Sequence, residues 1–579
     1  MTTTSWVESS GFISSHVLTN ATPSTIATAA LVTVVLIALT TRLISNSWGP
    51  LKGKDGTWSV GVAPYWFPLL GHIPILMINP DRFLRKLRDA SAHGIFAVNL
   101  GGSIHNLAHT PSLVEGIFAQ RTAVETEEFS MFILNRFFGV PRSFNKRLAG
   151  LFKGLTQSIS MCLMREPGLG KMLAGSVTSM NEHIPNLVSF ASRPIDQSLW
   201  ERASDADVWR SLKENGEADL AVEANFFPLL RNFMGHIATP LLMGQDFMDN
   251  YPEVLQDIWD LDYGLTYLIA GIPRWVPIPS LGRALRARER LNRKIADFHS
   301  AMDLAEDSKD PGSEWRDFSD ISDALKDRYR LWRENKIPPR LRSDLPLLWA
   351  MNVNSNNICF WLILRILSTP GLVGRIRTEI EPHVHASQPG NVLGLAEPPR
   401  LQMSVAGLRE ECPLLKSCYF EALRLDSAPL TIKHIVKDFI VTEDEKDAPG
   451  NARSFALKAG EYVHIPFDVH QSDPRYFSSP ELFIPERFLV RREGPGGKLE
   501  VDIGTLRPYG GGVAICKGKL FAEGEVLAFV AGIIALWDFE PVSGHGWQIP
   551  EHVRASGVTL PKSDIRVRVR RRKLEIGGG

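Results

Sequence analysis

The first long apolar run of the chain lies close to its N-terminus. Residues Thr25 to Ile44 read T-I-A-T-A-A-L-V-T-V-V-L-I-A-L-T-T-R-L-I, and Arg42 is the one charged residue among them. As a helix this run spans ~30 Å, about the hydrocarbon thickness of a bilayer. The polar leader before it contains no Lys or Arg, which favours a membrane span over a cleaved signal peptide or a buried core helix. Basic residues follow the run, so the positive-inside rule places the bulk of the chain in the cytosol.

The rest of the chain divides by composition. The stretch A-P-Y-W-F-P-L-L-G-H-I-P, from Ala63 to Pro74, contains three prolines and cannot be helical throughout. We therefore expect a luminal leader at 1–24, a transmembrane anchor at 25–44, and a basic, proline-rich linker and hinge at 45–80. Residues 81–579 then form one large domain, mainly α-helical with small β-sheets. Whether Asn20 in the leader is glycosylated stays open.

A second apolar run, from Leu345 to Leu367, has the length of a long helix but carries several polar residues. These are Asn352, Asn354, Ser355, Asn356 and Asn357. Such a cluster costs stability in a core unless its polar groups are paired or wetted. The pattern predicts a buried central helix beside a small polar pocket, not a second membrane span.

An apolar, proline-broken segment separates two predicted helices between Leu261 and Leu291. Apolar loops of this kind are unusual when they face water. Either the segment packs inside the protein, or it is exposed and contacts another apolar phase.

Three glycines and a cysteine precede the last apolar helix. Residues Leu506 to Glu525 read L-R-P-Y-G-G-G-V-A-I-C-K-G-K-L-F-A-E-G-E. The glycines predict a backbone that bends tightly or lets a flat group approach. Cys516 then lies near the unpaired N–H groups and positive dipole end of a helix start, which favour a thiolate. A redox sensor, a nucleophile, a metal ligand and a buried structural cysteine all remain possible at this point.

Charge and cysteine content narrow the function classes. The 579 residues carry 64 basic and 64 acidic side chains, so no overall field points to nucleic acid as a partner. The hydrophobic content of 44% is ample for a large core. The five cysteines form no C-x-x-C pair, and we expect a cytosol-facing domain without disulfides.

A charged pair and a distant arginine form one more candidate group. Glu421 and Arg424 lie three residues apart and so share a helix face, amid apolar neighbours. A buried pair of this kind needs a further partner. Arg487, in the run F-I-P-E-R-F-L, is a candidate for it.

Tyr509, Gly512, Cys516 and Gly518 form the pattern aromatic-x-x-Gly-x-x-x-Cys-x-Gly. This pattern resembles the haem-ligand loop of the cytochrome P-450 haem-thiolate enzymes, although Tyr509 stands where that family usually has Phe. The resemblance implies the fold of that family, a haem whose iron is bound by Cys516, and glycines that let the loop lie flat against the porphyrin. It also implies that Glu421, Arg424 and Arg487 lock together behind the loop. Lys433 falls where the family usually has an arginine that binds a haem propionate.

The central helix resembles the oxygen-binding helix of the family, with one departure. Asn354 and Ser355 occupy the places of the acid–alcohol pair that carries protons, and an amide does not relay protons as a carboxylate does. The sterol and bile-acid hydroxylase branch, which includes prostacyclin synthase, resembles this pattern. The runs A-G-I-P and R-A-R-E-R-L, within 270–291, are also similar to that branch. We therefore expect water relayed by Ser355, with Asn354 organising that water.

The resemblance implies a monooxygenase that inserts one atom of O2 into a bulky lipophilic substrate, sterol- or terpenoid-like. Electrons would come from NADPH through a flavoprotein cytochrome reductase, attracted by Lys517 and Lys519, at the endoplasmic reticulum membrane. The Asn354 departure leaves a second hypothesis, a haem-thiolate isomerase or dehydratase that needs no reductase. A non-catalytic haem sensor is the third hypothesis.

Overall fold

The computed structural model describes residues 22–46, 49–212, 218–389, 397–492, 497–555 and 557–574. Most of the predicted leader, with Asn20, lies outside the described residues. The chain divides into two compact units, Met1–Glu125 with Ile432–Ile465, and Thr126–Thr431 with Pro466–Gly579. The expected class, mainly α-helical with small sheets, is confirmed in both the helix content and the short strands. The expected domain boundaries stay predictions.

The first unit combines the N-terminal apolar helix with a five-stranded mixed sheet. The strand order is β1-β2-β12-β9-β3, in which β1 and β2 are antiparallel and β12 runs parallel to β2. Strands β10 and β11 form a separate antiparallel pair. The helices are α2 (Pro23–Asn46), α3 (Ile73–Ile78), α4 (Pro80–Ala90) and α5 (Pro111–Ala119). The strands are β1 (Ile95–Leu100), β2 (Ser103–Ala108), β3 (Val124–Glu125), β9 (Leu430–Ile435), β10 (Phe439–Thr442), β11 (Ser454–Leu457) and β12 (Tyr462–Pro466).

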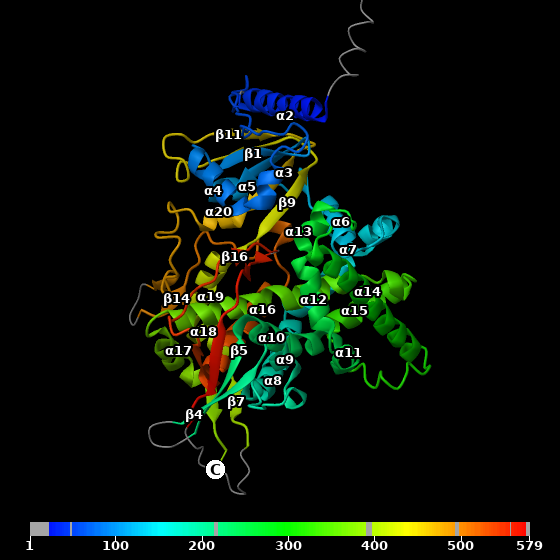
Figure 1. Ribbon diagram of the computed structural model, residues 1–579, viewed down its shortest axis with the longest axis vertical. Helices are drawn as coiled ribbons and strands as arrows, with labels where there is room; N and C mark the ends of the chain where they lie inside the picture. Colours follow the sequence, from blue (N-terminus) through cyan, green and yellow to red (C-terminus); the bar gives the residue numbers. More distant parts are fainter. Residues whose placement is uncertain are drawn as a thin grey trace, which may run out of the picture. The chain divides into compact units, whose positions relative to one another are not determined.

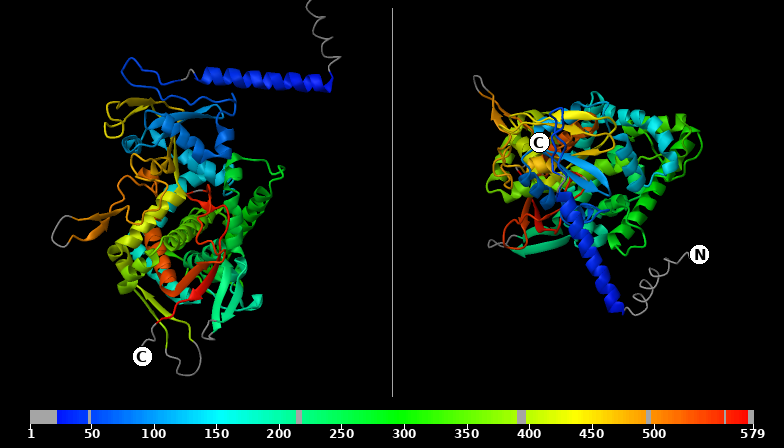
Figure 2. Two further views of the ribbon diagram at one scale, coloured as in Figure 1. Left: turned by 60° about the vertical axis from the view of Figure 1, so that its left-hand side comes forward. Right: turned by 90° about the horizontal axis from the view of Figure 1, so that it is seen from above.

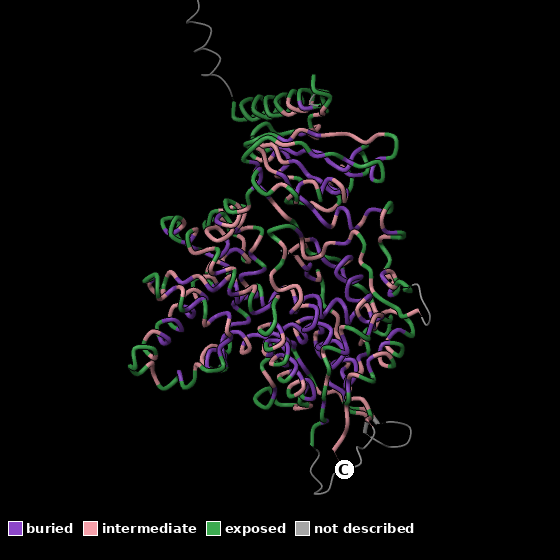
Figure 3. The backbone as a smooth tube through the Cα atoms, turned by 180° about the vertical axis from the view of Figure 1, so that it is seen from behind, coloured by how far each residue is buried: buried purple, intermediate pink, exposed green. Residues whose placement is uncertain are grey.

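Helix α2 contains the predicted membrane span and exposes its apolar side chains along its length (Figure 3). Among the described residues it is the one single helix that is long and apolar enough to cross a bilayer by itself. Its last turn is tied to the following linker, since the Tyr65 N–H donates to Ser45 Oγ at 3.0 Å and Arg42 donates to the Pro64 carbonyl. An exposed apolar helix of this length is compatible with a single-pass membrane anchor.

The second unit holds most of the helices, and Figure 1 shows α16 passing among them. Its α-helices are α6 (Glu127–Arg136), α7 (Asn145–Leu163), α8 (Gly168–His183), α9 (Leu199–Ala203), α10 (Phe226–Met243), α11 (Gln245–Asn250), α12 (Val254–Tyr263), α13 (Leu265–Ala270), α14 (Pro279–Glu306), α15 (Asp323–Glu334), α16 (Leu345–Ser368), α17 (Leu372–Ile380), α18 (Val405–Glu411), α19 (Pro413–Asp426), α20 (Phe467–Gln471) and α21 (Lys519–Leu536). Short 3-10 turns are η1 (Arg142–Phe144), η2 (Ile184–Asn186), η3 (Pro194–Asp196), η4 (Pro339–Leu341), η5 (Glu381–His383) and η6 (Gly512–Ala514).

Small sheets complete the second unit. The largest has the order β15-β19-β5-β4, and Figure 2 shows the C-terminal β19, in red, beside β5 from the middle of the chain. Antiparallel pairs form between β6 and β7, β8 and β17, β13 and β14, and β16 and β18. The strands are β4 (Asp207–Leu212), β5 (Ala218–Asn225), β6 (Val384–Ser387), β7 (Arg400–Met403), β8 (Ser427–Ala428), β13 (Leu489–Arg491), β14 (Leu499–Val501), β15 (Trp537–Pro541), β16 (His552–Val553), β17 (Gly557–Val558), β18 (Leu560–Pro561) and β19 (Arg566–Arg571).

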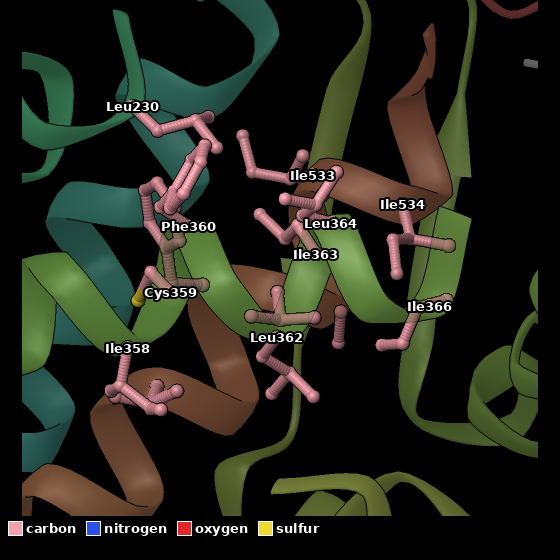
Figure 4. Packing of buried hydrophobic residues seen from close by; sticks show 14 of the residues in the cluster. Leu230, Ile358, Cys359, Phe360, Leu362, Ile363, Leu364, Ile366, Ile533 and Ile534 are labelled. Carbon is pink, nitrogen blue, oxygen red and sulfur yellow. The ribbon is translucent and has the colours of Figure 1, made fainter. Parts of the chain in front are cut away.

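Helix α16 forms the centre of the second unit's core, as its apolar pattern predicts. Its C-terminal half packs between α10 and α21, with Leu230, Ile363 and Ile533 among the side chains in contact (Figure 4). The Phe360 ring makes an edge contact with Phe227, at a centroid distance of 5.0 Å. Each large side chain fully buried in this way contributes about 1.5–3 kcal/mol relative to exposure, so α16 is a core helix and not a membrane span.

Hydrogen bonds pair some of the buried amide groups of α16, whereas Asn356 Oδ1 and both side-chain polar atoms of Asn357 have no partner among the described residues. Asn352 donates to the Leu348 carbonyl at 3.1 Å and accepts from the Thr239 hydroxyl at 3.2 Å. Asn356 donates to the Arg231 carbonyl at 3.1 Å. These hydrogen bonds offset the cost of burying the amides, and they tie α16 to α10.

The apolar loop between α13 and α14 is exposed. Of the two possibilities that the sequence left open, packing inside the protein and contact with another apolar phase, the structure favours the second. Residues 271–278 are irregular, and Trp275 is 80% exposed. A large indole in water is unfavourable, which supports the interpretation that this loop contacts an apolar phase.

Candidate active site

A cavity of about 670 Å³ lies within the second unit. Its wall is formed mainly by apolar side chains of α6, α7, α16 and α21, together with the segment after α19 and the loop that carries Cys516. Of the described residues that line it, Arg328 and Lys517 are the charged ones. Cavities of this size and polarity are typical of sites for small molecules.

The glycine loop presents Cys516 to this cavity. The Cys516 N–H donates to the Tyr509 carbonyl at 3.0 Å and closes the loop. Gly510 and Gly512 take φ angles of +72° and +60°, in the left-handed region that side chains with a Cβ disfavour. Gly510 lines the cavity, whereas Gly512 is exposed and begins η6. Cys516 is exposed as a residue and lines the cavity, while the protein atoms around its sulfur desolvate the thiol.

The electrostatic setting of the Cys516 thiol differs in part from the prediction. Burial raises its pKa, while a hydrogen bond from the Gly518 backbone and the nearby Lys517 and Lys519 lower it. The N–H groups and cations that favour a thiolate are therefore present, but in the protein alone they are outweighed by desolvation.

The other four cysteines lie elsewhere and are also free, so the expected absence of disulfides holds for all five. Burial raises the pKa of Cys412 to about 12, and it also raises the pKa values of Cys162, Cys359 and Cys418. These side chains stay thiols at neutral pH. Cys516 is the cysteine that lines the cavity.

Asn354 and Ser355 also line the cavity, from the middle of α16. The Val558 N–H donates to Asn354 Oδ1 at 2.9 Å, so the amide is tied to β17. Gly557 makes this approach possible, because a Cβ there would lie 2.6 Å from the same oxygen. Ser355 is buried, with its hydroxyl near the Glu525 carboxyl of α21.

Glu421, Arg424 and Arg487 lie in mutual contact in the second unit. Glu421 is fully buried and accepts from Arg424 Nε at 2.8 Å and from Arg487 Nε at 2.9 Å. Arg424 also donates to the carbonyls of Gln471 and Pro480, which fixes the segment that follows α20. One carboxylate between two guanidinium groups is a fully paired arrangement of buried charge.

Tyr509 connects the cysteine loop to α19. Its hydroxyl lies 2.5 Å from the Tyr419 hydroxyl, and both side chains line the cavity. Burial raises the pKa values of both phenols, so each stays protonated. A phenylalanine at position 509 would lack this bond, and no local pattern marks Tyr419 as its partner.

Replacing Tyr509 by phenylalanine is expected to destabilise the protein by about 1–3 kcal/mol, because the buried Tyr419 hydroxyl loses its partner. Chemical unfolding, followed by the fluorescence of the tryptophans, measures this loss. The double variant Tyr419→Phe/Tyr509→Phe removes both hydroxyls and should be closer to the wild type than Tyr509→Phe alone. Additive losses in the double variant would contradict the coupling.

Lys433 belongs to the first unit, where it lies on β9. It is buried, and its ammonium lies 5.9 Å from the centroid of the Phe118 ring. Burial lowers its pKa. Its predicted contact with a haem propionate stays a prediction.

The residues present fit a haem in three respects. A single thiol faces the cavity, and thiolate sulfur is a soft ligand suited to iron. Gly510 and Gly512, which have positive φ angles, place no side chain on the loop. Gly518 also leaves the sulfur uncrowded, since even a Cβ atom there would lie 3.9 Å from Cys516 Sγ. The remaining wall is largely apolar, as a porphyrin face requires.

Three features of the site escaped the sequence analysis. Arg328, at the cavity wall, is paired with the buried Asp344, which also accepts from His299 at 2.8 Å. Burial raises the pKa of Asp344, but Arg328 and His299 outweigh this effect and lower it. Gly557 and Glu525 were also missed. For Glu525 a signal existed, since it is an acid inside the apolar run of α21.

A mainly helical protein with small sheets and one cysteine-bearing glycine loop at an apolar cavity is typical of the haem-thiolate class. Residues 347–569 match the cytochrome P-450 family model. A cytochrome P-450 monooxygenase, efuG of Hormonema carpetanum, is 24% identical over 94% of this chain and 96% of its own length. Prostacyclin synthase of Rattus norvegicus is 28% identical over 39% of this chain and 44% of its own length. The 7-alpha-hydroxycholest-4-en-3-one 12-alpha-hydroxylase of Oryctolagus cuniculus is 29% identical over 42% of this chain and 48% of its own length.

Over residues 347–569 the chain is therefore similar to the cytochrome P-450 family, and its relatives include both fungal monooxygenases and mammalian members of the branch that the resemblance indicated. Members of the family carry a haem held by a cysteine thiolate.

Proposed function

We propose that this chain is a membrane-bound haem-thiolate monooxygenase in which Cys516 is the axial ligand of the haem iron. The observation that supports this most is the position of Cys516, which lines the cavity on a glycine loop while the other four cysteines lie elsewhere. When bound, the haem supplies the activation of O2 and the transfer of one oxygen atom into a C–H bond.

The chain's own residues have distinct tasks in this proposal. The apolar side chains of α16 and α21, such as Ile358 and Phe521, exclude water from the cavity and hold an apolar substrate. The Ser355 hydroxyl can both donate and accept a proton at the cavity wall. Asn354, held by the Val558 N–H, fixes this part of α16 and presents its amide N–H groups to water.

The substrate class follows from the cavity. Its lining is largely apolar over about 670 Å³, which suits a bulky lipophilic molecule of sterol or terpenoid type, such as a specialised metabolite. The printed name of the rabbit relative, a hydroxylase of a cholestenone, supports this class. The exposed Trp275 loop supports access from an apolar phase.

Two partners complete the proposal. Helix α2 would anchor the chain in the endoplasmic reticulum membrane, and recovery of the full chain in carbonate-washed microsomes tests this placement. An NADPH-cytochrome reductase would supply the electrons. Lys517 and Lys519 follow Cys516 and would flank the proximal face, where positive charge would attract an acidic flavoprotein.

The test uses the full chain in microsomes with a flavoprotein reductase. A spin-shift screen against sterols, terpenoids and fatty acids identifies a ligand, which is then incubated with NADPH under isotopically heavy O2. We expect one heavy oxygen atom in the product and no product without NADPH. Conversion of the ligand without NADPH and without label would replace this proposal by the isomerase or dehydratase, and binding without any conversion would support the sensor.

A further inference from the structure

Glu525 is a buried acid that the site described above does not use. Helix α21 carries two glutamates, and Glu523 is paired with Lys416 at 2.9 Å near the surface. Glu525 is 1% exposed, and neither of its carboxyl oxygens has a hydrogen bond of normal geometry among the described residues. The Ser355 hydroxyl is near enough to interact with this carboxyl.

Burial without a charged partner keeps Glu525 neutral. An isolated carboxylate in a protein interior is strongly disfavoured, and the group takes up a proton instead. Desolvation raises the pKa of Glu525 to about 8, against the smaller opposite effect of Ser355. Cys359, one turn beyond Ser355 on α16, is the titratable neighbour on that helix, and it is also a neutral thiol. Glu525 therefore holds a proton at neutral pH.

The position of Glu525 connects this proton to the cavity. Phe521 and Ala522, four and three residues before it on α21, line the cavity and share its side of the helix. Ser355 both lines the cavity and lies beside the Glu525 carboxyl. The serine hydroxyl is thus placed between the acid and the cavity.

The acid that α16 lacks at position 354 is therefore present on another helix. Asn354 has no titratable proton, and its carbonyl oxygen is engaged by Val558. We propose that Glu525 is the acid that supplies protons, through the Ser355 hydroxyl, to oxygen reduction in the cavity. This inference rests on the proposed monooxygenase function.

The proton transfer balances in a simple way. Insertion of one oxygen atom from O2 consumes two electrons from NADPH and two protons, and the second oxygen atom leaves as water. For each proton, Ser355 donates its hydroxyl proton to the oxygen being reduced. The Glu525 O–H bond breaks at the same time, and that proton forms a new O–H bond on Ser355. The Glu525 carboxylate that remains is reprotonated from solvent water.

The decisive variant is Glu525→Gln, which keeps the size of the neutral side chain but has no transferable proton. The full chain in microsomes, with flavoprotein reductase, NADPH and the ligand found in the spin-shift screen, is assayed for product, peroxide and NADPH consumed. We expect product per NADPH to fall about 10-fold or more, with a matching rise in peroxide. Ser355→Ala should give the same change, and the double variant should be no worse than either single one.

Controls separate this role from a structural one. Glu523→Gln, two residues away on the same helix, should keep the wild-type ratio of product to NADPH. In the wild type, protein stability should fall as pH rises from about 4.5 to about 8, because the folded protein holds a proton that the unfolded chain releases. Glu525→Gln should remove this slope.

The outcomes are distinguishable. If the wild type and Glu525→Gln give the same high ratio of product to NADPH consumed, the inference is wrong and the monooxygenase proposal stands. Glu525→Gln tests the inference only if it folds, which its red-shifted carbonyl Soret band shows. If that band is lost, a wild-type ratio of product to NADPH in Ser355→Ala overturns the inference. If the wild type itself incorporates no oxygen, both proposals fail together.

Discussion

Replacing Cys516 by alanine is expected to abolish the red-shifted carbonyl Soret band and all NADPH-dependent oxygenation. The red shift requires a thiolate on the iron, and the structure offers Cys516 as the sulfur at the cavity wall. Alanine loses the hydrogen bond that the thiol accepts from the Gly518 backbone but keeps the bond from the backbone N–H of residue 516 to the Tyr509 carbonyl, which closes the loop. The variant should therefore fold, which circular dichroism and the unfolding midpoint can confirm.

The matched control for this prediction is Cys412→Ala. Cys412 is buried at the start of α19, and its pKa of about 12 keeps it a thiol. Its loss removes one sulfur from the core and should cost about 1–3 kcal/mol of stability without changing the carbonyl spectrum. An unchanged spectrum in Cys516→Ala, or a lost band in Cys412→Ala, would assign the ligand to another residue.

The parts of this molecule that the sequence predicted are those set by local pattern. Helix α19 (Pro413–Asp426) places Glu421 and Arg424 in contact on one face, as their spacing of three residues predicted. Helix α16 ends one residue beyond the predicted Leu367. The glycine loop was also foreseen, since only glycine tolerates the φ angles found at 510 and 512.

The parts that the sequence did not predict depend on contacts between distant segments. The partner of Asn354 is Val558, about 200 residues further along the chain, and no local pattern marks such a pair. The bond between Tyr419 and Tyr509 has the same origin. The exposure of Trp275 was undecided for a related reason, because an apolar loop has no periodicity that shows which side it presents.

Electrostatics at the site required the fold as well. The sequence indicated that N–H groups and cations near Cys516 favour a thiolate, and those groups are present. Desolvation of the thiol opposes them and raises its pKa. This effect depends on how the loop packs, which the sequence does not show. Glu525 shows the same limit, since its proton affinity follows from burial among helices and not from its neighbours in sequence.

Replacing Glu421 by glutamine is expected to destabilise the second unit by about 3–5 kcal/mol, because it leaves two guanidinium groups without a buried counter-charge. Glu421 is fully buried and accepts from both Arg424 and Arg487, and the Ile484 N–H donates to it at 3.1 Å. Glutamine keeps the shape but brings its own N–H groups against the guanidinium N–H groups. The unfolding midpoint of the full-length protein in urea measures the loss.

The control lies on the same turn as Arg487. Glu486 pairs with Arg375 at 2.5 Å, but both side chains are largely exposed, at 44% and 53%. Exposed pairs contribute at most about 1 kcal/mol, so Glu486→Gln should leave the midpoint nearly unchanged. Because the Glu421 group fixes the segments around α19, we also expect Glu421→Gln to weaken haem retention while Glu486→Gln does not. Equal losses in the two variants would show that the buried group has no special role in holding this part of the protein.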